Sequence, residues 1–103
     1  MRRPVEWSRA ALHDFDRSIA YIAIRNPSAA TRVAERIDKA ARLLGEMASG
    51  RQGRVTGTYE KVVHGLPYII AYRLVPLPDG AEKVVILRVI HGARKWLPKE
   101  WPD

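Results

Sequence analysis

Four side chains in the second half of the chain have the chemistry needed to cleave RNA. Such a site requires a base to take the 2′-hydroxyl proton, cations to hold the phosphate and an acid for the leaving oxygen. The candidates are His91, Arg73, Arg94 and Glu60. His91 and Arg94 come at the end of a long apolar run, where side chains emerge from a sheet. The residue types therefore allow a ribonuclease, provided that the fold brings them together.

The same residues also have structural interpretations. His91 suits a turn in which its ring bonds to the backbone. Arg73 and Arg88 interrupt apolar runs, and a guanidinium in a mostly buried strand needs a partner or an opening to solvent. Glu60 is a candidate partner for Arg73. The residues alone do not decide between catalysis and structure.

A second group of candidates follows the last apolar run. It consists of Arg94, Lys95, Trp96 and Lys99, and no acidic residue occurs between positions 88 and 99. Cations attract an acidic or nucleic-acid-bearing target, and an indole supplies area to bury against it. We expect this group to bind a target, and its last member, Lys99, belongs to a C-terminal tail at residues 97–103.

Composition limits the possible functions. The 103 residues carry a net charge of +7, which favours an acidic protein segment or nucleic acid as partner. Cysteine is absent, so disulfides and thiolate metal sites are excluded and a reducing cytoplasm is expected. His13, His64 and His91 share no ligand spacing, and no metal or other cofactor is predicted. No apolar stretch approaches the roughly 20 residues of a membrane span.

Periodicity predicts the elements of the first half of the chain. A strand is expected at residues 5–7, followed by Ser8 as a helix N-cap. Pro27 disfavours helical geometry at Asn26 but fits the first position of a new helix, which predicts an antiparallel helical hairpin. The expected core faces comprise Leu12, Phe15, Ile19 and Ile22 on the first helix, and Ala30, Val33, Ile37, Ala40, Leu44 and Met47 on the second.

The second half predicts a sheet. A glycine-rich loop at residues 49–58, expected to be mobile, precedes three strand-like runs that begin at Tyr59, Pro67 and Val84. The two later runs are apolar on both alternating faces, as is typical of central strands. The predicted fold is a single α+β domain of residues 1–103. Its order is β-α-α-β-β-β, with the helical hairpin packed on a small, largely antiparallel sheet.

The hairpin also carries side chains outside its expected core faces. Arg17, Tyr21 and Ile24 lie roughly opposite the apolar stripe of the first helix, so either a second layer or a partner covers them. On the second helix, a cationic stripe could hold DNA phosphate or an acidic antitoxin, or it could form a solvated face. It consists of Arg32, Arg36 and Lys39.

Several strings, in this order and spacing, resemble one protein family over nearly the whole chain. They are Val5-Glu6-Trp7-Ser8, Tyr21-Ile22 before Asn26-Pro27-Ser28-Ala29-Ala30, Gly53-Arg54 before Gly57-Thr58-Tyr59-Glu60, the run 67–73 and the run 85–94. The chain resembles the ParE branch, the plasmid-stabilisation type, of the ParE/RelE superfamily of bacterial toxins. It departs from that pattern at Tyr59, where the family more often has arginine.

The resemblance implies a toxin of a type II toxin–antitoxin system. As a ParE-like protein it would poison DNA gyrase as a binding protein rather than as an enzyme, and an acidic ParD-like antitoxin would neutralise it in a hetero-oligomer. The expected antitoxin-binding residues are Arg17, Tyr21, Ile24 and Arg73. The expected target-binding residues are Arg94, Lys95, Trp96 and Lys99.

Two alternatives remain open at this level. A RelE-like protein would be a ribosome-dependent mRNA endonuclease, and it would use the His91, Arg73, Arg94 and Glu60 set. A direct DNA-binding module would use the basic helical hairpin. The toxin branches share one fold, so the fold cannot choose between gyrase and the ribosome as the target.

Overall fold

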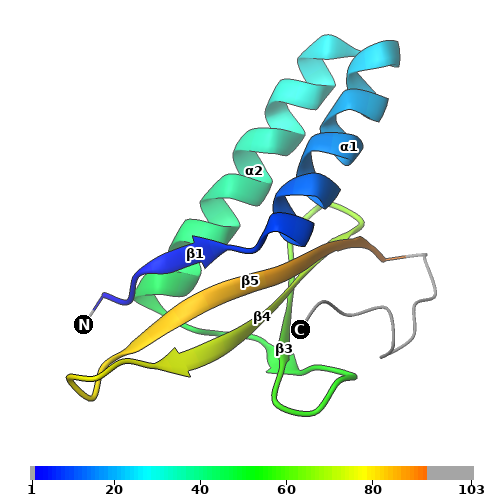
Figure 1. The fold of residues 1–103 in the computed structure, drawn as a ribbon. Helices are drawn as coiled ribbons and strands as arrows, with labels where there is room; N and C mark the ends of the chain where they lie inside the picture. Colours follow the sequence, from blue (N-terminus) through cyan, green and yellow to red (C-terminus); the bar gives the residue numbers. More distant parts are fainter. Residues whose placement is uncertain (1, 93–103) are drawn as a thin grey trace.

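The computed structural model describes residues 2–92, and residues 1 and 93–103 lie outside this description. Two helices pack on one face of a five-stranded sheet (Figure 1). The elements are β1 (Val5–Trp7), α1 (Arg9–Arg25), α2 (Pro27–Glu46), β2 (Arg51–Gln52), β3 (Tyr59–Val62), β4 (Tyr68–Pro76) and β5 (Glu82–His91). The strand order is β1-β5-β4-β3-β2, in which β1 runs parallel to β5 and the other neighbours are antiparallel. The predicted α+β fold is confirmed, with β2 as an additional strand.

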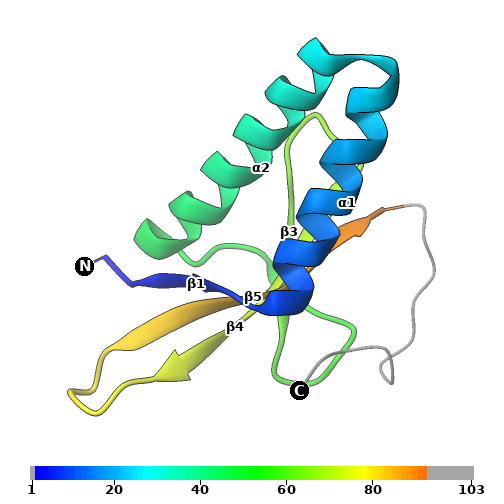
Figure 2. The same ribbon diagram turned by 45° about the horizontal axis from the view of Figure 1, so that its top comes forward.

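A single residue connects the two helices. The Asn26 N–H donates to the Ile22 carbonyl at 2.8 Å, and the Asn26 side chain accepts from the Ala29 N–H at 3.0 Å. Pro27 takes the first position of α2, where its missing N–H removes no helical hydrogen bond. Figure 2 shows that the hairpin rises away from the sheet, so that its free end stands clear of the strands. The predicted antiparallel hairpin is confirmed.

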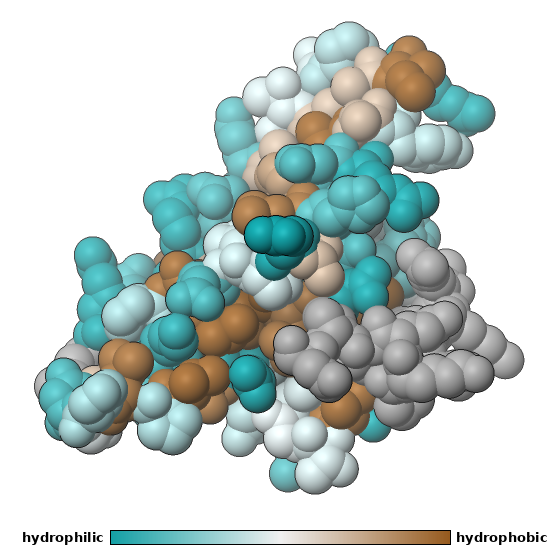
Figure 3. Space-filling view, in the orientation of Figure 1, coloured by the Kyte–Doolittle hydropathy of each residue, from teal (hydrophilic) through white to brown (hydrophobic). Residues whose placement is uncertain are grey.

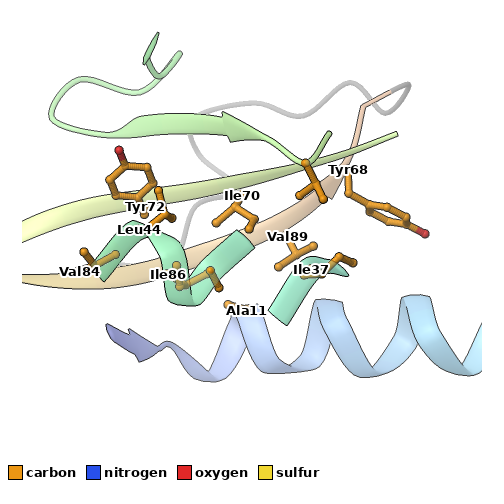
Figure 4. Close-up of a cluster of buried hydrophobic side chains, with 11 residues drawn as sticks. Ala11, Ile37, Leu44, Tyr68, Ile70, Tyr72, Val84, Ile86 and Val89 are labelled. Carbon is orange, nitrogen blue, oxygen red and sulfur yellow. The ribbon is translucent and has the colours of Figure 1, made fainter. Parts of the chain in front are cut away.

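The core lies between the hairpin and the sheet (Figure 4). Its most buried large side chains are Ile37 and Leu44 from α2, Ile70 and Tyr72 from β4, and Val84 and Ile86 from β5. These strands are central in the sheet, as predicted. On the opposite face, Val55 from the loop before β3 packs over Ala71 and Ile90. Both faces of the central strands are therefore partly covered, which explains their apolar residues at odd and even positions.

A β-bulge interrupts β5. Tyr72 pairs with Ile86, but the preceding residue, Ala71, pairs with Arg88, so Leu87 has no partner of its own on β4. A bulge changes the side chains that follow it from one face of the sheet to the other. The second half of β5 therefore has the opposite alternation from its first half.

An ion pair joins α1 to β5 at this bulge. Arg88 donates from Nε and Nη2 to the two carboxylate oxygens of Asp14, at 2.7 and 2.8 Å, and the Val89 N–H donates to Asp14 Oδ2 at 3.0 Å. The Arg88 and Asp14 side chains are only 23% and 11% exposed. Three hydrogen bonds to one carboxylate leave α1 little freedom to rotate about its axis.

Two predicted core residues are exposed instead. Leu12 is 48% exposed and Met47 is 71% exposed. Successive residues are about 100° apart around a helix, so Leu12 lies about 200° from Asp14, which faces β5. Ala11 is buried in the core instead. Met47 is the C-cap of α2, where the backbone is extended and the helical spacing no longer applies.

We predict that Asp14→Asn lowers the free energy of unfolding by about 2–3 kcal/mol, because it leaves a partly buried guanidinium without its counter-charge. Urea denaturation of both proteins measures the change. The matched control is Asp16→Asn, an exposed carboxylate on the same helix, which should stay within about 0.5 kcal/mol of the wild type. Equal stability of the two variants would contradict a structural role for the ion pair.

Candidate functional site

Glu60, one of the four ribonuclease candidates, is a buried structural carboxylate. It is 3% exposed. Arg54 donates to Oε2 from its backbone N–H at 3.0 Å and from Nε at 3.1 Å, and Arg51 Nη2 lies 3.5 Å from Oε1. The partners of Glu60 are thus Arg54 and Arg51, and the expected ion pair with Arg73 is wrong.

The contacts of Glu60 keep it ionised. Burial raises its pKa, but the hydrogen bonds from the Arg54 backbone and guanidinium, the Arg54 charge and the bond from Arg51 outweigh burial, so the pKa lies below its usual value. An ionised, fully engaged carboxylate is a poor proton donor at neutral pH. Through these bonds, Glu60 anchors the loop that precedes β3. The glycine content of this loop had predicted that it would be mobile.

His91 and Arg73 lie on opposite faces of the sheet. The His91 ring contacts the edge of Tyr68, a core residue on the helix side, with ring centroids 5.4 Å apart. Arg73 is an odd number of positions from Tyr68 on β4 and therefore points to the other face. Arg73 pairs with Val85 and His91 with Tyr68, and these rungs are about 16 Å apart at about 3.3 Å per residue.

The bulge in β5 accounts for this separation. Without it, the alternation from Val85, which shares a face with Arg73, would place His91 on that same face. His91 is thus apart from Arg73. The fourth member, Arg94, lies outside the described residues, as do Lys95, Trp96 and Lys99, so the target-binding group stays a prediction.

Arg17, Tyr21 and Ile24 share one exposed side of α1. Their spacing of four and three residues places them on neighbouring turns. Tyr21 is 65% and Ile24 84% exposed, and the Arg25 guanidinium lies 5.9 Å from the centroid of the Tyr21 ring, a distance typical of cation–π contacts. Figure 3 shows hydrophobic atoms at the free end of the hairpin. Arg73, the fourth residue of the predicted partner site, is exposed on the sheet face remote from the helices.

Tyr21 is exposed because the sheet ends beneath it. It follows Asp14 by seven residues, nearly two full helical turns, so the two side chains leave α1 in almost the same direction. Asp14 meets β5 through Arg88. Farther along the helix, the hairpin has passed the sheet (Figure 2). The outer end of α1 therefore presents an apolar side with no strand beneath it.

Reasoning from the sequence missed a groove between α2 and β3. Its volume is about 520 Å³. It is lined by Ala40, Leu43, Leu44, Glu46, Met47, Ser49, Lys61, Val62 and His64. Leu43, Met47 and Val62 are 49%, 71% and 53% exposed. The sequence feature that could have indicated this groove is Leu43 next to Leu44. Together these two residues make the apolar stripe of α2 wider than the part of the helix that packs on the sheet.

Within residues 2–92, no group of three or more His, Cys, Asp and Glu side chains could hold a metal ion. That part of the chain also has no helix that is both long and apolar enough to cross a membrane.

Comparison with known proteins defines the class. The family described as the ParE toxin of the type II toxin–antitoxin system, parDE, matches residues 5–96. A protein of Sinorhizobium fredii (strain NBRC 101917 / NGR234), named "Putative toxin Y4kP", is 41% identical over 96 residues, covering 92% of this chain and 94% of that protein. The chain therefore belongs to the ParE toxin family of type II toxin–antitoxin systems.

Two solved structures share the fold. The chromosomal ParDE toxin–antitoxin system from P. aeruginosa aligns with a TM-score of 0.77 at 20% identity, covering 87% of this chain and 96% of that one. The toxin–antitoxin complex RelBE2 from Mycobacterium tuberculosis aligns with a TM-score of 0.60 at 23% identity, covering 88% and 99%. The predicted resemblance to ParE/RelE toxins is confirmed.

We predict that Glu60→Gln destabilises the protein by about 1–2 kcal/mol at pH 7, where it weakens charged hydrogen bonds. The folded-state pKa of Glu60 is depressed, so its stabilisation is present above the usual value of 4.5 and is lost as the pH falls through the folded value. The difference between variant and wild type should therefore shrink below that pH. Urea denaturation across a pH series measures it.

The matched control for this series is Glu35→Gln, an exposed carboxylate on α2. Its difference from the wild type should be small at every pH. A Glu60→Gln difference that stays constant down to pH 3 would contradict the depressed pKa.

Proposed function

We propose that this ParE-family toxin poisons DNA gyrase by binding it, and that an acidic ParD-like antitoxin neutralises the toxin by covering the outer end of α1. Membership of the ParE family supports both parts. The fold shared with the ParDE system of P. aeruginosa supports the pairing with an antitoxin.

The observation that carries the antitoxin proposal is the exposed apolar side of α1. Tyr21 and Ile24 are the kind of side chains that a folded partner buries. Arg17 and Arg25 flank them and can pair with carboxylates. An amphipathic acidic segment fits this combination, and the toxin's net charge of +7 attracts it.

Gyrase is favoured over mRNA as the target because the candidate acid–base residues do not form a single catalytic site. Glu60 is engaged by Arg54 and Arg51, and His91 and Arg73 lie on opposite faces. A direct DNA-binding module is disfavoured because one residue joins two antiparallel helices, whereas a recognition-helix motif needs a wider crossing angle. Arg94, Lys95, Trp96 and Lys99 are proposed as the contacts to the target.

We predict that His91→Ala leaves toxicity in bacteria within a few-fold of the wild type. Removal of a general acid or base from a nuclease typically costs about 100-fold or more. Growth on induction measures toxicity. The accompanying readouts are filamentation and the DNA-damage response, expected for gyrase, against early loss of translation with cut mRNA. A loss near 100-fold together with cut mRNA would favour the RelE-like endonuclease, provided that circular dichroism shows a folded protein.

We predict opposite effects for changes at the two proposed binding regions. Ile24→Asp should weaken antitoxin binding about tenfold or more, because it places a charge in an apolar contact, and should leave toxicity nearly unchanged. Deletion of residues 95–103 should weaken toxicity more than antitoxin binding. Calorimetry with the product of the adjoining gene measures binding, and growth on induction measures toxicity.

The control for this pair is Pro78→Ala, an exposed position in the turn between β4 and β5. It should change neither measurement. If the deletion instead lowers the melting temperature by several degrees, residues 95–103 contribute to stability rather than to target binding.

A further inference from the structure

Three cations form a row on the outer side of α2. Arg32, Arg36 and Lys39 are four and three residues apart, so they lie within about 60° of one another around the helix. All three are exposed, whereas Ile37, on the core side of the same helix, is fully buried. At about 1.5 Å per residue, the row is about 10.5 Å long. We call this straight line of positive charge the α2 cation row.

The row is not neutralised within residues 2–92. Arg32, Arg36 and Lys39 form no ion pair with a carboxylate of that part of the chain. Asp38, on the same helix, pairs with Arg42 at 2.9 Å instead. Like charges four residues apart, as at Arg32 and Arg36, destabilise a helix slightly. An anionic partner bound along the row would remove that repulsion.

The turn between β3 and β4 holds the Arg36 guanidinium in place. Gly65 in this turn has a φ of +78°, and a Cβ at its position would lie 3.0 Å from Nη2 and 3.2 Å from Nη1 of Arg36. The turn lies beside α2 (Figure 2). Because its backbone packs against the guanidinium, the Arg36 side chain has fewer conformations to lose when it binds a partner.

The surroundings of the row favour a phosphate backbone over a protein segment. Val33 and Ile37 pack toward the core, and no large apolar side chain of α2 shares the side of the row before Leu43. Protein interfaces depend on buried aromatic or apolar anchors, which the row does not offer. Each strand of duplex DNA carries one phosphate about every 3.4 Å along the axis, so a row of about 10.5 Å spans about three phosphates.

We propose that the α2 cation row binds the phosphate backbone of duplex DNA. The contact is electrostatic and independent of base sequence. It therefore differs from a base-reading recognition helix, which the hairpin geometry disfavours. The inference deepens the proposed function and rests on it for the source of the DNA, because gyrase acts on duplex DNA and would bring it to the bound toxin. The other source is the operator DNA of the toxin–antitoxin genes.

The test measures binding of the full chain to a fluorescein-labelled duplex of about 24 base pairs and mixed sequence, by anisotropy at about 50 to 200 mM NaCl. Wild-type affinity should fall about 40-fold or more over this range, as expected for three phosphate contacts. Arg36→Gln should reduce the slope of log K against log salt concentration by about 0.9. Combining it with Arg32→Gln and Lys39→Gln should reduce the slope by about 2.7. An unchanged slope in this triple variant would overturn the proposal.

Matched variants separate the row from net charge. Arg9→Gln removes an exposed cation from the first turn of α1 and should leave the slope unchanged, so equal losses for Arg9→Gln and Arg36→Gln would overturn the proposal. Glu35→Gln removes the carboxylate one turn before Lys39 and should tighten binding about two- to fivefold, whereas Asp16→Asn on α1 should not. If the triple variant fails a thermal melt, these single variants decide the matter.

Two competitors identify the class of ligand. Polyglutamate of the same charge as the duplex should compete at least about tenfold less well, because carboxylates on a flexible chain do not present a regular row. Single-stranded RNA of the same sequence should also bind more weakly, since its phosphates are not held at fixed spacing. Tighter binding of either competitor through the row would overturn the assignment to duplex DNA.

The last arms separate the sources of DNA and the proposed function. With gyrase as the source, the triple variant should trap about tenfold less cleaved plasmid on gyrase than the wild type. Unchanged trapping, with weaker binding of the variant's antitoxin complex to operator DNA, would support the contact and assign it to the operator. A wild type that traps no cleaved DNA but binds the duplex through the row would remove the proposed function and leave the inference. A triple variant that binds the duplex normally and the antitoxin weakly would make the row a protein contact and overturn the inference alone.

Discussion

The ion pair between Arg88 and Asp14 sets the orientation of α1 on the sheet. A guanidinium within a largely apolar strand requires a counter-charge, and the Asp14 carboxylate on α1 supplies it beside the bulge at Leu87. Because this carboxylate also accepts the Val89 N–H, the rotation of α1 about its axis is fixed at that level. Leu12 then turns outward, and Tyr21 leaves the helix in line with Asp14.

Both apolar surfaces of the toxin arise where helix extends past sheet. At the free end of α1, the hairpin continues after the strands have stopped. Along α2, Leu43 and Met47 extend beyond an edge at which β2 is only two residues long. In each place the helix has an apolar side that would normally be covered by another layer. A partner that covers both would complete the architecture of the toxin rather than add a separate domain to it.

The sequence was sufficient for the order of the main elements, the dual role of Asn26 and the central position of β4 and β5, because caps and alternation are local signals. The exposure of Arg17, Tyr21 and Ile24 also followed from local spacing.

The bulge could not be predicted, because in a run that is apolar at every position an extra, unpaired residue does not change the hydrophobic pattern. This one shift separates His91 from Arg73. The partner of Glu60 was missed because Arg54 lies in a loop whose path depends on the finished fold. The groove could not be predicted because it depends on where β2 ends beside β3, and the length of so short a strand is not apparent from the sequence.

The connection through Asn26 also limits how toxins of this shape can diverge. One residue ends α1 and begins α2, so an insertion there would break a cap on one helix or the other. Lengthening either helix by one residue would rotate everything beyond it by about 100° and take its core face off the sheet. Under the proposal that the antitoxin covers the outer end of α1, a hairpin of fixed length leaves side-chain replacement as the means of discriminating between cognate and foreign antitoxins. Separate toxin–antitoxin pairs within one cell would then be insulated from each other through a few exposed positions on α1.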